Sequence, residues 1–153
     1  MSSDRLLLGA LLAMVLVLGC AGSTVRASAP PLAPCPNKPN CVSSQAPDDD
    51  HRAEPYRLAP GKGWAAVRDA VASMPRTTIV EERPGYLHAE SRSRIFRFVD
   101  DLELSSNEAG DRVDVRSASR TGYGDWGVNR ARVEALREAL VANGAIVGGA
   151  AAR

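Results

Sequence analysis

The chain has 153 residues, a formal net charge of +1 and only 5% aromatic residues. Once a leader is removed, this length supports one domain of roughly 100–120 residues. The balanced charge produces no long-range field for a polyanion, and the few aromatic residues argue against a base-stacking surface, so we expect no nucleic-acid binding.

The N-terminus has the pattern of an export leader. Arg5 precedes an apolar run over residues 6–18, which has the length of a signal-peptide core and is shorter than the roughly 20 residues of a membrane-spanning helix. The run ends in VLGC at residues 17–20, which resembles the bacterial lipobox and predicts lipidation of Cys20. The alternative is cleavage after ASA at residues 27–29, which would release a soluble periplasmic protein.

Lipidation of Cys20 would attach the chain to a membrane, because an anchor with more than one acyl chain is stable. Residues 1–19 would then be the signal peptide, and the small, polar, proline-containing residues 20–34 an extended tether. Ala21 after the cysteine resembles lipoproteins sent to the outer membrane. We therefore expect a lipid anchor in the cell envelope, in the outer membrane and facing the periplasm.

The other two cysteines, Cys35 and Cys41, lie in the motif CPNKPNC. In an exported chain they predict a structural disulfide, which stabilises the fold by constraining the unfolded state. Their spacing differs from the C-x-x-C of thiol oxidoreductases, and no Cys/His pair follows at a zinc-site spacing. The acidic run around His51 lacks the glycine and distal glutamate of a calcium loop. We therefore expect no metal and no cofactor.

Residues 35–144 have the patterns of a single α+β domain. Apolar residues spaced by three or four predict helices over residues 62–73 and 128–142, and Asp125 or Asn129 is suited to cap the second one. Period-two alternation predicts four strands, over residues 77–82, 86–93, 96–104 and 112–120.

The third predicted strand keeps its alternation through Asp100, which places this carboxylate on the core face with Phe96 and Phe98. The elements together predict an antiparallel sheet of about four strands, covered on one face by two helices. Residues 145–153 are expected to form a frayed tail.

Three blocks of the chain carry a resemblance to a known family. CPNKPNCVSS, HAESRSRIFRFVDDLEL and VRSASRTGYGDWGVNRARVEALR are similar to the family catalogued as domain of unknown function 1499. The similarity covers roughly Cys35 to Arg137. The family occurs in bacterial envelope proteins and in plastid-bearing eukaryotes and has no established activity. The resemblance therefore implies export and one compact domain, and it assigns no chemistry.

His88 and Glu90 form the first candidate site. They share a strand face with Arg92, so an imidazole positioned by a carboxylate beside a cation predicts a small hydrolase or isomerase. Cross-strand ion pairs on a solvated sheet give the same pattern without catalysis. The sequence has no G-x-S-x-G nucleophile elbow, so covalent catalysis has no candidate residue.

The second candidate site joins arginines with polar residues near the glycine-rich loop TGYGDWG. Its members are Arg92, Arg94, Arg116, Arg120, Asp100, Asp125, Asn129 and Arg130. Guanidinium forks, together with backbone N–H groups at a helix start, predict a site for a carboxylate or phosphate. The alternative is a structural network in which Asp100 and Asp125 are buried against Arg94 and Arg116.

We therefore expect an envelope lipoprotein that is a non-enzymatic binding or accessory module with an arginine-rich site for an anionic group. Its expected partners are the membrane, through the lipid anchor, and an anionic small molecule, lipid or envelope protein. A purely structural role in an envelope complex would show instead as a contiguous exposed apolar patch.

Overall fold

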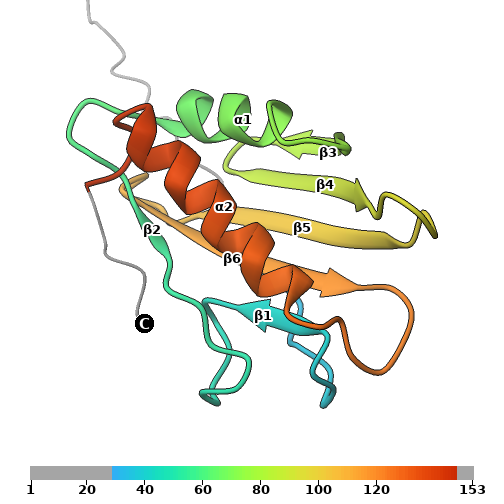
Figure 1. The fold of residues 1–153 in the computed structure, drawn as a ribbon. Helices are drawn as coiled ribbons and strands as arrows, with labels where there is room; N and C mark the ends of the chain where they lie inside the picture. Colours follow the sequence, from blue (N-terminus) through green and yellow to red (C-terminus); the bar gives the residue numbers. More distant parts are fainter. Residues whose placement is uncertain (1–28, 148–153) are drawn as a thin grey trace, which may run out of the picture.

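The computed structural model describes residues 29–147, which form an α+β fold with an antiparallel sheet, as the sequence predicted (Figure 1). The strands are β1 Cys41–Ser43, β2 Tyr56–Arg57, β3 Thr77–Arg83, β4 Tyr86–Arg92, β5 Val99–Ser106 and β6 Arg112–Ser119. The helices are α1 Trp64–Ala72 and α2 Val128–Ala142.

The sheet has the strand order β1-β6-β5-β4-β3, and β2 also pairs with β6. Strands β3 to β6 are the four strands that the sequence predicted, and they pair antiparallel with their chain neighbours as a meander. The two added strands both pair with β6: Cys41 lies opposite Ala118, and Tyr56 lies opposite Val113. The sequence missed them because strands of three and two residues are too short to show a periodicity.

Both helices lie against one face of the sheet (Figure 1). Helix α1 buries Val67 and Val71, and α2 buries Val133, Leu136 and Leu140, the inward residues that its sequence predicted. They pack with inward side chains of the long strands: Leu87, Ala89, Leu102, Leu104, Val113 and Val115. Full burial of each larger aliphatic side chain contributes about 1.5–3 kcal/mol, so this layer is the core of the domain.

The third long strand begins later than predicted. Alternation predicted a strand from Phe96 with two phenylalanines on the core face, but β5 begins at Val99, and Phe96 and Phe98 are 74% and 55% exposed. Arg97 has a φ of 55°, a left-handed conformation that an extended strand does not allow. Residues 93–98 are therefore a loop between β4 and β5. Asp100 does lie on the core side, 6% exposed, as predicted.

The N-terminal side of the domain packs earlier than the predicted boundary at Cys35. Leu32 is buried, and Ser105 Oγ donates a hydrogen bond of 2.8 Å to the carbonyl of Pro30. The predicted signal peptide and the predicted lipidation site Cys20 lie outside the described residues. Within residues 29–147, no helix has both the length and the apolar character needed to cross a membrane.

The C-terminal end of the core also differs from the prediction, which placed Ala145 and Ile146 in a frayed tail. Both side chains are buried, and both backbone amides donate to the carbonyl of Leu140. The chain can return onto the core here because Gly144, with a φ of 68°, takes the left-handed conformation that often follows a helix.

Candidate functional site

The sheet face opposite the helices carries a network of paired charges. Arg116 donates to Glu103 over 2.7 Å, and the two residues are direct partners in the β5–β6 register. Arg120 donates to Asp101 and to Glu90, each over 2.7 Å. These two hydrogen bonds raise the pKa of Arg120 above its usual range. Because each guanidinium already has a carboxylate partner, neither offers an unpaired charge to a ligand anion.

His88 belongs to the same network, but its partner is not Glu90. Its Nε2 lies 2.7 Å from Asp101 Oδ1 across the β4–β5 pair, whereas Glu90 pairs with Arg120 and Arg92. Burial alone would raise the pKa of Asp101, but hydrogen bonds from Arg120 and His88 outweigh burial and lower it. The arrangement is that of an ion-pair network on a sheet surface.

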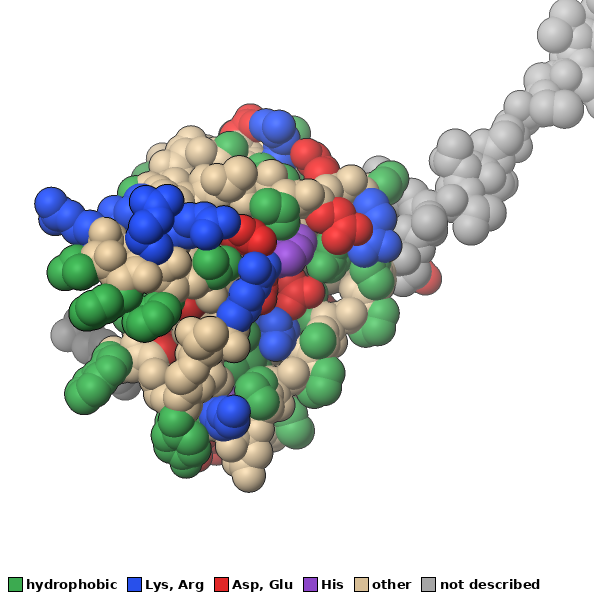
Figure 2. Space-filling model, turned by 90° about the vertical axis from the view of Figure 1, so that its right-hand side faces the viewer, with side chains coloured by type: hydrophobic (Ala, Val, Ile, Leu, Met, Phe, Trp, Pro, Cys, Tyr) green, Lys and Arg blue, Asp and Glu red, His purple; other side chains and the backbone are tan. Residues whose placement is uncertain are grey.

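Two loops meet at one end of the sheet: residues 93–98 between β4 and β5, and residues 120–127 between β6 and α2 (Figure 1). Figure 2 shows hydrophobic side chains gathered beside basic ones on this side of the molecule. The exposed apolar side chains of the two loops are Ile95 (79%), Phe96 (74%), Phe98 (55%), Tyr123 (73%) and Trp126 (101%). We call these five side chains the apolar tip. Apolar side chains exposed together, rather than singly, mark an interaction surface.

A groove of about 580 Å³ lies between these loops. Its apolar walls come from both loops and from the start of α2: Ile95, Phe96, Phe98, Trp126 and Val128. Asp100, Ser119 and Asp125 also line it and supply polar groups. A cleft of this size with mostly apolar walls and a few placed polar groups is typical of a small-molecule site.

Hydrogen bonds fix the polar side of the groove. Asp100 accepts a hydrogen bond of 2.6 Å from Arg132 on α2, and both side chains are largely buried. Asn129, which is fully buried, donates to Ser119 Oγ and to the carbonyl of Asn40. Asn40 precedes Cys41, whose predicted disulfide with Cys35 is present. The groove is therefore backed by a rigid polar layer that joins α2, β6 and the disulfide ring.

Gly127 is the N-cap residue of α2, so the prediction that Asp125 or Asn129 caps this helix is wrong, but Asp125 lies two residues before the cap and contacts the helix start. Its carboxylate accepts hydrogen bonds of 2.9 Å from the backbone amides of Gly127 and Asn129. Burial alone would raise the pKa of Asp125, but these hydrogen bonds and one from the Asn129 side chain outweigh burial and lower it. The carboxylate of Asp125 is thus charged at neutral pH, and it occupies the helix start where the sequence predicted a ligand anion.

Arg94 and Arg97 are the basic residues within the 93–98 loop. Neither forms an ion pair with any residue between 29 and 147. Arg94 lines the groove, and both belong to the loop that carries three apolar-tip side chains. Arg92, at the end of β4, contacts Glu90 over 2.8 Å. The loop therefore presents unpaired positive charge beside an apolar groove.

The structure divides the eight predicted binding residues among several places, and Arg94 is the one arginine of this set that lines the groove. On the open sheet face lie Arg92, Arg116 and Arg120, and at α2 or beneath it lie Asp100, Asp125 and Asn129. Arg130 donates to the backbone carbonyls of residues 50 and 52, away from the groove. The predicted pairing of Asp100 and Asp125 with Arg94 and Arg116 is wrong, because their partners are Arg132 and Asn129.

Sequence reasoning missed Arg132 and the apolar tip. Arg132 follows Asn129 by three positions, a spacing that places two residues on the same side of a helix. The sequence pattern could therefore have predicted Arg132 as a neighbour of Asn129. Alternation predicts the two phenylalanines on the core face because their pattern continues that of β5. Trp126 lies in a glycine-rich loop, and a large aromatic residue between glycines was a signal for an exposed contact.

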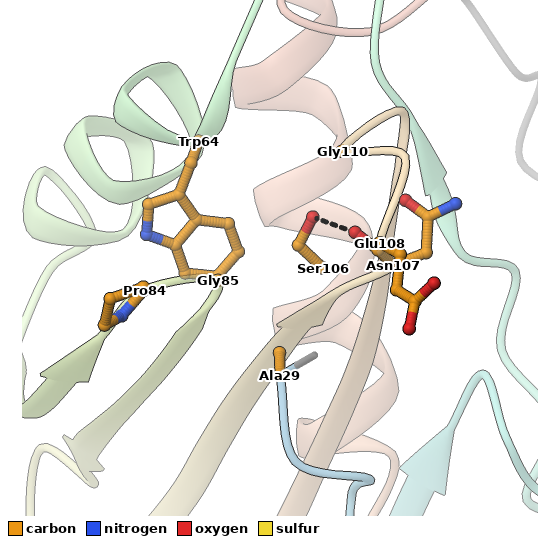
Figure 3. Close-up of a pocket in the computed structure, with 8 residues that line it drawn as sticks. All are labelled: Ala29, Trp64, Pro84, Gly85, Ser106, Asn107, Glu108 and Gly110. Carbon is orange, nitrogen blue, oxygen red and sulfur yellow. Dashed lines mark hydrogen bonds between the residues drawn. The ribbon is translucent and has the colours of Figure 1, made fainter. Parts of the chain in front are cut away.

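A second cavity, of about 340 Å³, lies at the opposite end of the sheet, at the β3–β4 turn (Figure 3). The ring of Trp64 from α1 points across it toward Ser106, and Gly85 and Ala29 also line it. No Lys, Arg or His lines this cavity, so it lacks the cation of the predicted anion site. Among residues 29–147, no group of three or more His, Cys, Asp or Glu side chains could hold a metal ion.

Comparison with known proteins gives one match. A family model described as "Protein of unknown function (DUF1499)" matches residues 31–140, which include all six strands, α1 and most of α2. No curated protein and no solved structure matches the chain.

Proposed function

Because the chain belongs to the DUF1499 family, whose description assigns no activity, we propose a function from its own surface. The protein is a non-enzymatic, envelope-anchored module that binds an anionic amphiphile in the groove at the loop end. The apolar part of the ligand lies between the two loops, and its anionic group meets Arg94 and Arg97. One observation carries this proposal: Arg94 lines an apolar groove, Arg97 belongs to the same loop, and neither arginine has a carboxylate partner among residues 29–147.

The apolar walls account for part of the binding free energy. Phe96 and Trp126 are mostly exposed to water in the structure. A ligand chain that removes about 150 Å² of apolar surface from water gains roughly 4 kcal/mol, at about 25 cal/mol per Å². That gain alone corresponds to about millimolar affinity at best. The apolar contact therefore needs a second, polar contribution to give useful affinity.

The loop arginines supply that contribution better than the arginines of the sheet. A hydrogen bond to a charged group contributes about 1.5–3 kcal/mol, so one contact each from Arg94 and Arg97 would bring the affinity to the micromolar range or below. A ligand anion at Arg116 or Arg120 would have to displace Glu103 or Asp101 from an existing contact. The loop pair has no such competitor among the described residues.

The proposed location is the cell envelope, with lipidated Cys20 as the anchor in the outer membrane, and a soluble periplasmic protein as the alternative. The leader pattern of the sequence supports export, and so does the Cys35–Cys41 disulfide, because disulfides persist in oxidising compartments. The intact mass of the protein from its own membrane fraction tests the anchor. We expect a mature chain that begins at Cys20 with added acyl mass, and no such mass for a Cys20→Ser variant.

The geometry gives no support to the alternative, a hydrolase or isomerase acting through His88 and Glu90. His88 contacts Asp101 instead, and Glu90 is engaged by two arginines. Neither side chain lines the groove or the cavity at the opposite end. The apolar tip would also support a structural role in an envelope complex. The following experiment separates such a role from ligand binding.

Native mass spectrometry of the full chain, extracted in mild detergent, tests the proposal. We expect a bound anionic amphiphile on the wild type and its loss from the Arg94→Ala/Arg97→Ala variant. The matched control Arg57→Ala/Lys62→Ala removes the same charge from two exposed residues that do not line the groove, and it keeps the ligand. A wild type without ligand, or a ligand retained after loss of both loop arginines, refutes the proposal.

A further inference from the structure

We propose that the anionic amphiphile is a lipid still in its bilayer: the apolar tip docks the domain onto an anionic membrane surface. This inference rests on the function proposed above and names the source of the ligand. Five apolar side chains on two separate loops are each more than half exposed, and the first of these loops also holds Arg94 and Arg97, which have no ion-pair partner among the described residues. That combination fits the boundary between lipid headgroups and acyl chains.

The shape of the tip favours insertion into a surface. Trp126 is fully exposed at 101%, and Phe96 is exposed at 74%, so neither ring packs into the core. Trp126 and Arg97 both have a positive φ, 56° and 55°, at positions that are not glycine. Such a conformation is uncommon outside glycine, and here it occurs once in each loop that carries exposed rings. Side chains that protrude in this way enter a deformable surface without a preformed partner pocket.

Aromatic and basic residues together select a membrane interface. Trp and Tyr are enriched at headgroup depth, where an apolar ring and a polar atom are both satisfied. The tip carries Trp126 and Tyr123, and its first loop has the sequence SRIFRF from Ser93 to Phe98, with no acidic residue. Anionic lipids attract basic residues near their surface by about 1 kcal/mol each.

The two acidic groups that line the groove are each engaged by donors of the fold. Asp100 is paired with Arg132 and is 6% exposed. Asp125 is held by the backbone amides at the start of α2. The charge that the 93–98 loop presents to a membrane is therefore that of Arg94 and Arg97. The described chain begins at the other end of the sheet, where Ala29 lies beside Gly85.

Quenching of tryptophan fluorescence by brominated lipid tests the inference with the full chain. The protein has two tryptophans, Trp64 and Trp126, and subtracting the signal of a Trp126→Phe variant isolates the second. Vesicles are prepared from brominated phosphatidylglycerol or from brominated phosphatidylcholine. Because bromine quenches only a ring that enters the acyl region, the measurement reports the position of the tip even when a lipid anchor already holds the chain on the vesicle.

We expect quenching of Trp126 in phosphatidylglycerol vesicles and much less in phosphatidylcholine. Removing two charges that contribute about 1 kcal/mol each lowers the docking equilibrium constant roughly 30-fold, so Arg94→Ala/Arg97→Ala loses most of the quenching. The control Arg57→Ala/Lys62→Ala, which removes the same charge outside the tip, keeps it.

Absence of Trp126 quenching in every vesicle overturns membrane docking. The function proposed above is tested separately with dodecyl phosphate below its critical micelle concentration. A blue shift of Trp126 fluorescence with this soluble probe, without quenching by vesicles, would support ligand binding in the groove and refute membrane docking. A tip-dependent dimer in the native mass spectrum, without quenching, also overturns docking and assigns the tip to a protein contact.

Discussion

Replacement of Asn129 by leucine tests whether this buried amide organises the polar layer behind the groove. Its Nδ2 donates to the carbonyl of Asn40 (3.0 Å), to Ser119 Oγ (2.9 Å) and to Asp125 (2.7 Å), so two N–H bonds are shared among three acceptors. Its Oδ1 accepts from the Ser117 hydroxyl at 2.7 Å and from a neighbouring guanidinium at 2.6 Å. Leucine has a similar size and makes none of these contacts.

The expected loss in the free energy of unfolding follows from these contacts. The two N–H bonds of the amide and the two hydrogen bonds that its Oδ1 accepts make four. At about 1 kcal/mol each their loss is about 4 kcal/mol, and the greater apolar burial of leucine offsets part of it. We expect Asn129→Leu to cost about 3 kcal/mol, which for a domain of this size lowers Tm by roughly 12 °C. Ser117 is 0% exposed, and its hydroxyl would lose its acceptor. The double variant Asn129→Leu/Ser117→Ala should therefore lose about 1 kcal/mol less unfolding free energy than the sum of the two single variants.

Urea unfolding followed by far-UV circular dichroism, with the disulfide intact, measures these losses. The midpoint should fall while the m-value stays constant, since the same surface is exposed on unfolding. Ser119→Ala is the matched control, because it removes one of the three acceptors, and it should cost about 1 kcal/mol. A loss below about 1 kcal/mol for Asn129→Leu, or strict additivity with Ser117→Ala, would refute the assigned role of the amide.

Three further predictions concern the rest of the domain. Arg116→Ala leaves a half-buried glutamate without its cation, so urea unfolding should show a loss of about 2 kcal/mol, while native mass spectrometry shows unchanged amphiphile binding; loss of the ligand would restore Arg116 as a binding residue. Replacing Cys35 and Cys41 by serine should cost about 2 kcal/mol, because the closed ring is short, and an unchanged urea midpoint would contradict this. A backbone carbonyl and the carboxylate of Asp48 raise the pKa of His51. This stabilisation is therefore complete below the unfolded-state value of about 6.5 and is lost as pH rises through the folded-state pKa. The difference in unfolding free energy between wild type and His51→Gln should be larger at low pH than at high pH, and a difference that grows with pH would reverse the assignment.

The sequence predicted elements that carry a long periodic pattern. Helix α2 has the predicted bounds of residues 128–142, because its apolar residues repeat over four turns and Gly144 ends it. Strand β6 shows the predicted alternation, with Val113 and Val115 inward and Arg116 on the open face. The same kind of pattern gave a wrong prediction for Phe96. The period-two alternation continues through Arg97, but the left-handed φ of Arg97 prevents an extended strand there, and a hydrophobicity pattern does not reveal this φ.

The sequence predicted some residues of the candidate site but not how they are arranged in space. The arginine-dense stretch of the sequence contains the loop that borders the groove, and Arg94 lines the groove. The partners of the other arginines depend on strand register, which the sequence does not specify. Glu103 neutralises Arg116 only because β5 and β6 pair with these residues opposite each other. The groove forms only because two loops meet at one end of the sheet. These loops begin at Ser93 and at Arg120, 27 positions apart in the sequence.

Strand register also explains why the arginines of the sheet and those of the loop differ in their availability to a ligand. Glu90 and Asp101 are direct cross-strand partners in the β4–β5 register. Two like charges in that arrangement repel each other, so a cation between them is a structural requirement, and Arg120 meets it by contacting both carboxylates. The 93–98 loop has no strand partner and no acidic residue. Arg94 and Arg97 therefore neutralise no carboxylate between residues 29 and 147, and this difference from Arg120 is why the proposed ligand contact is placed at the loop and not on the sheet.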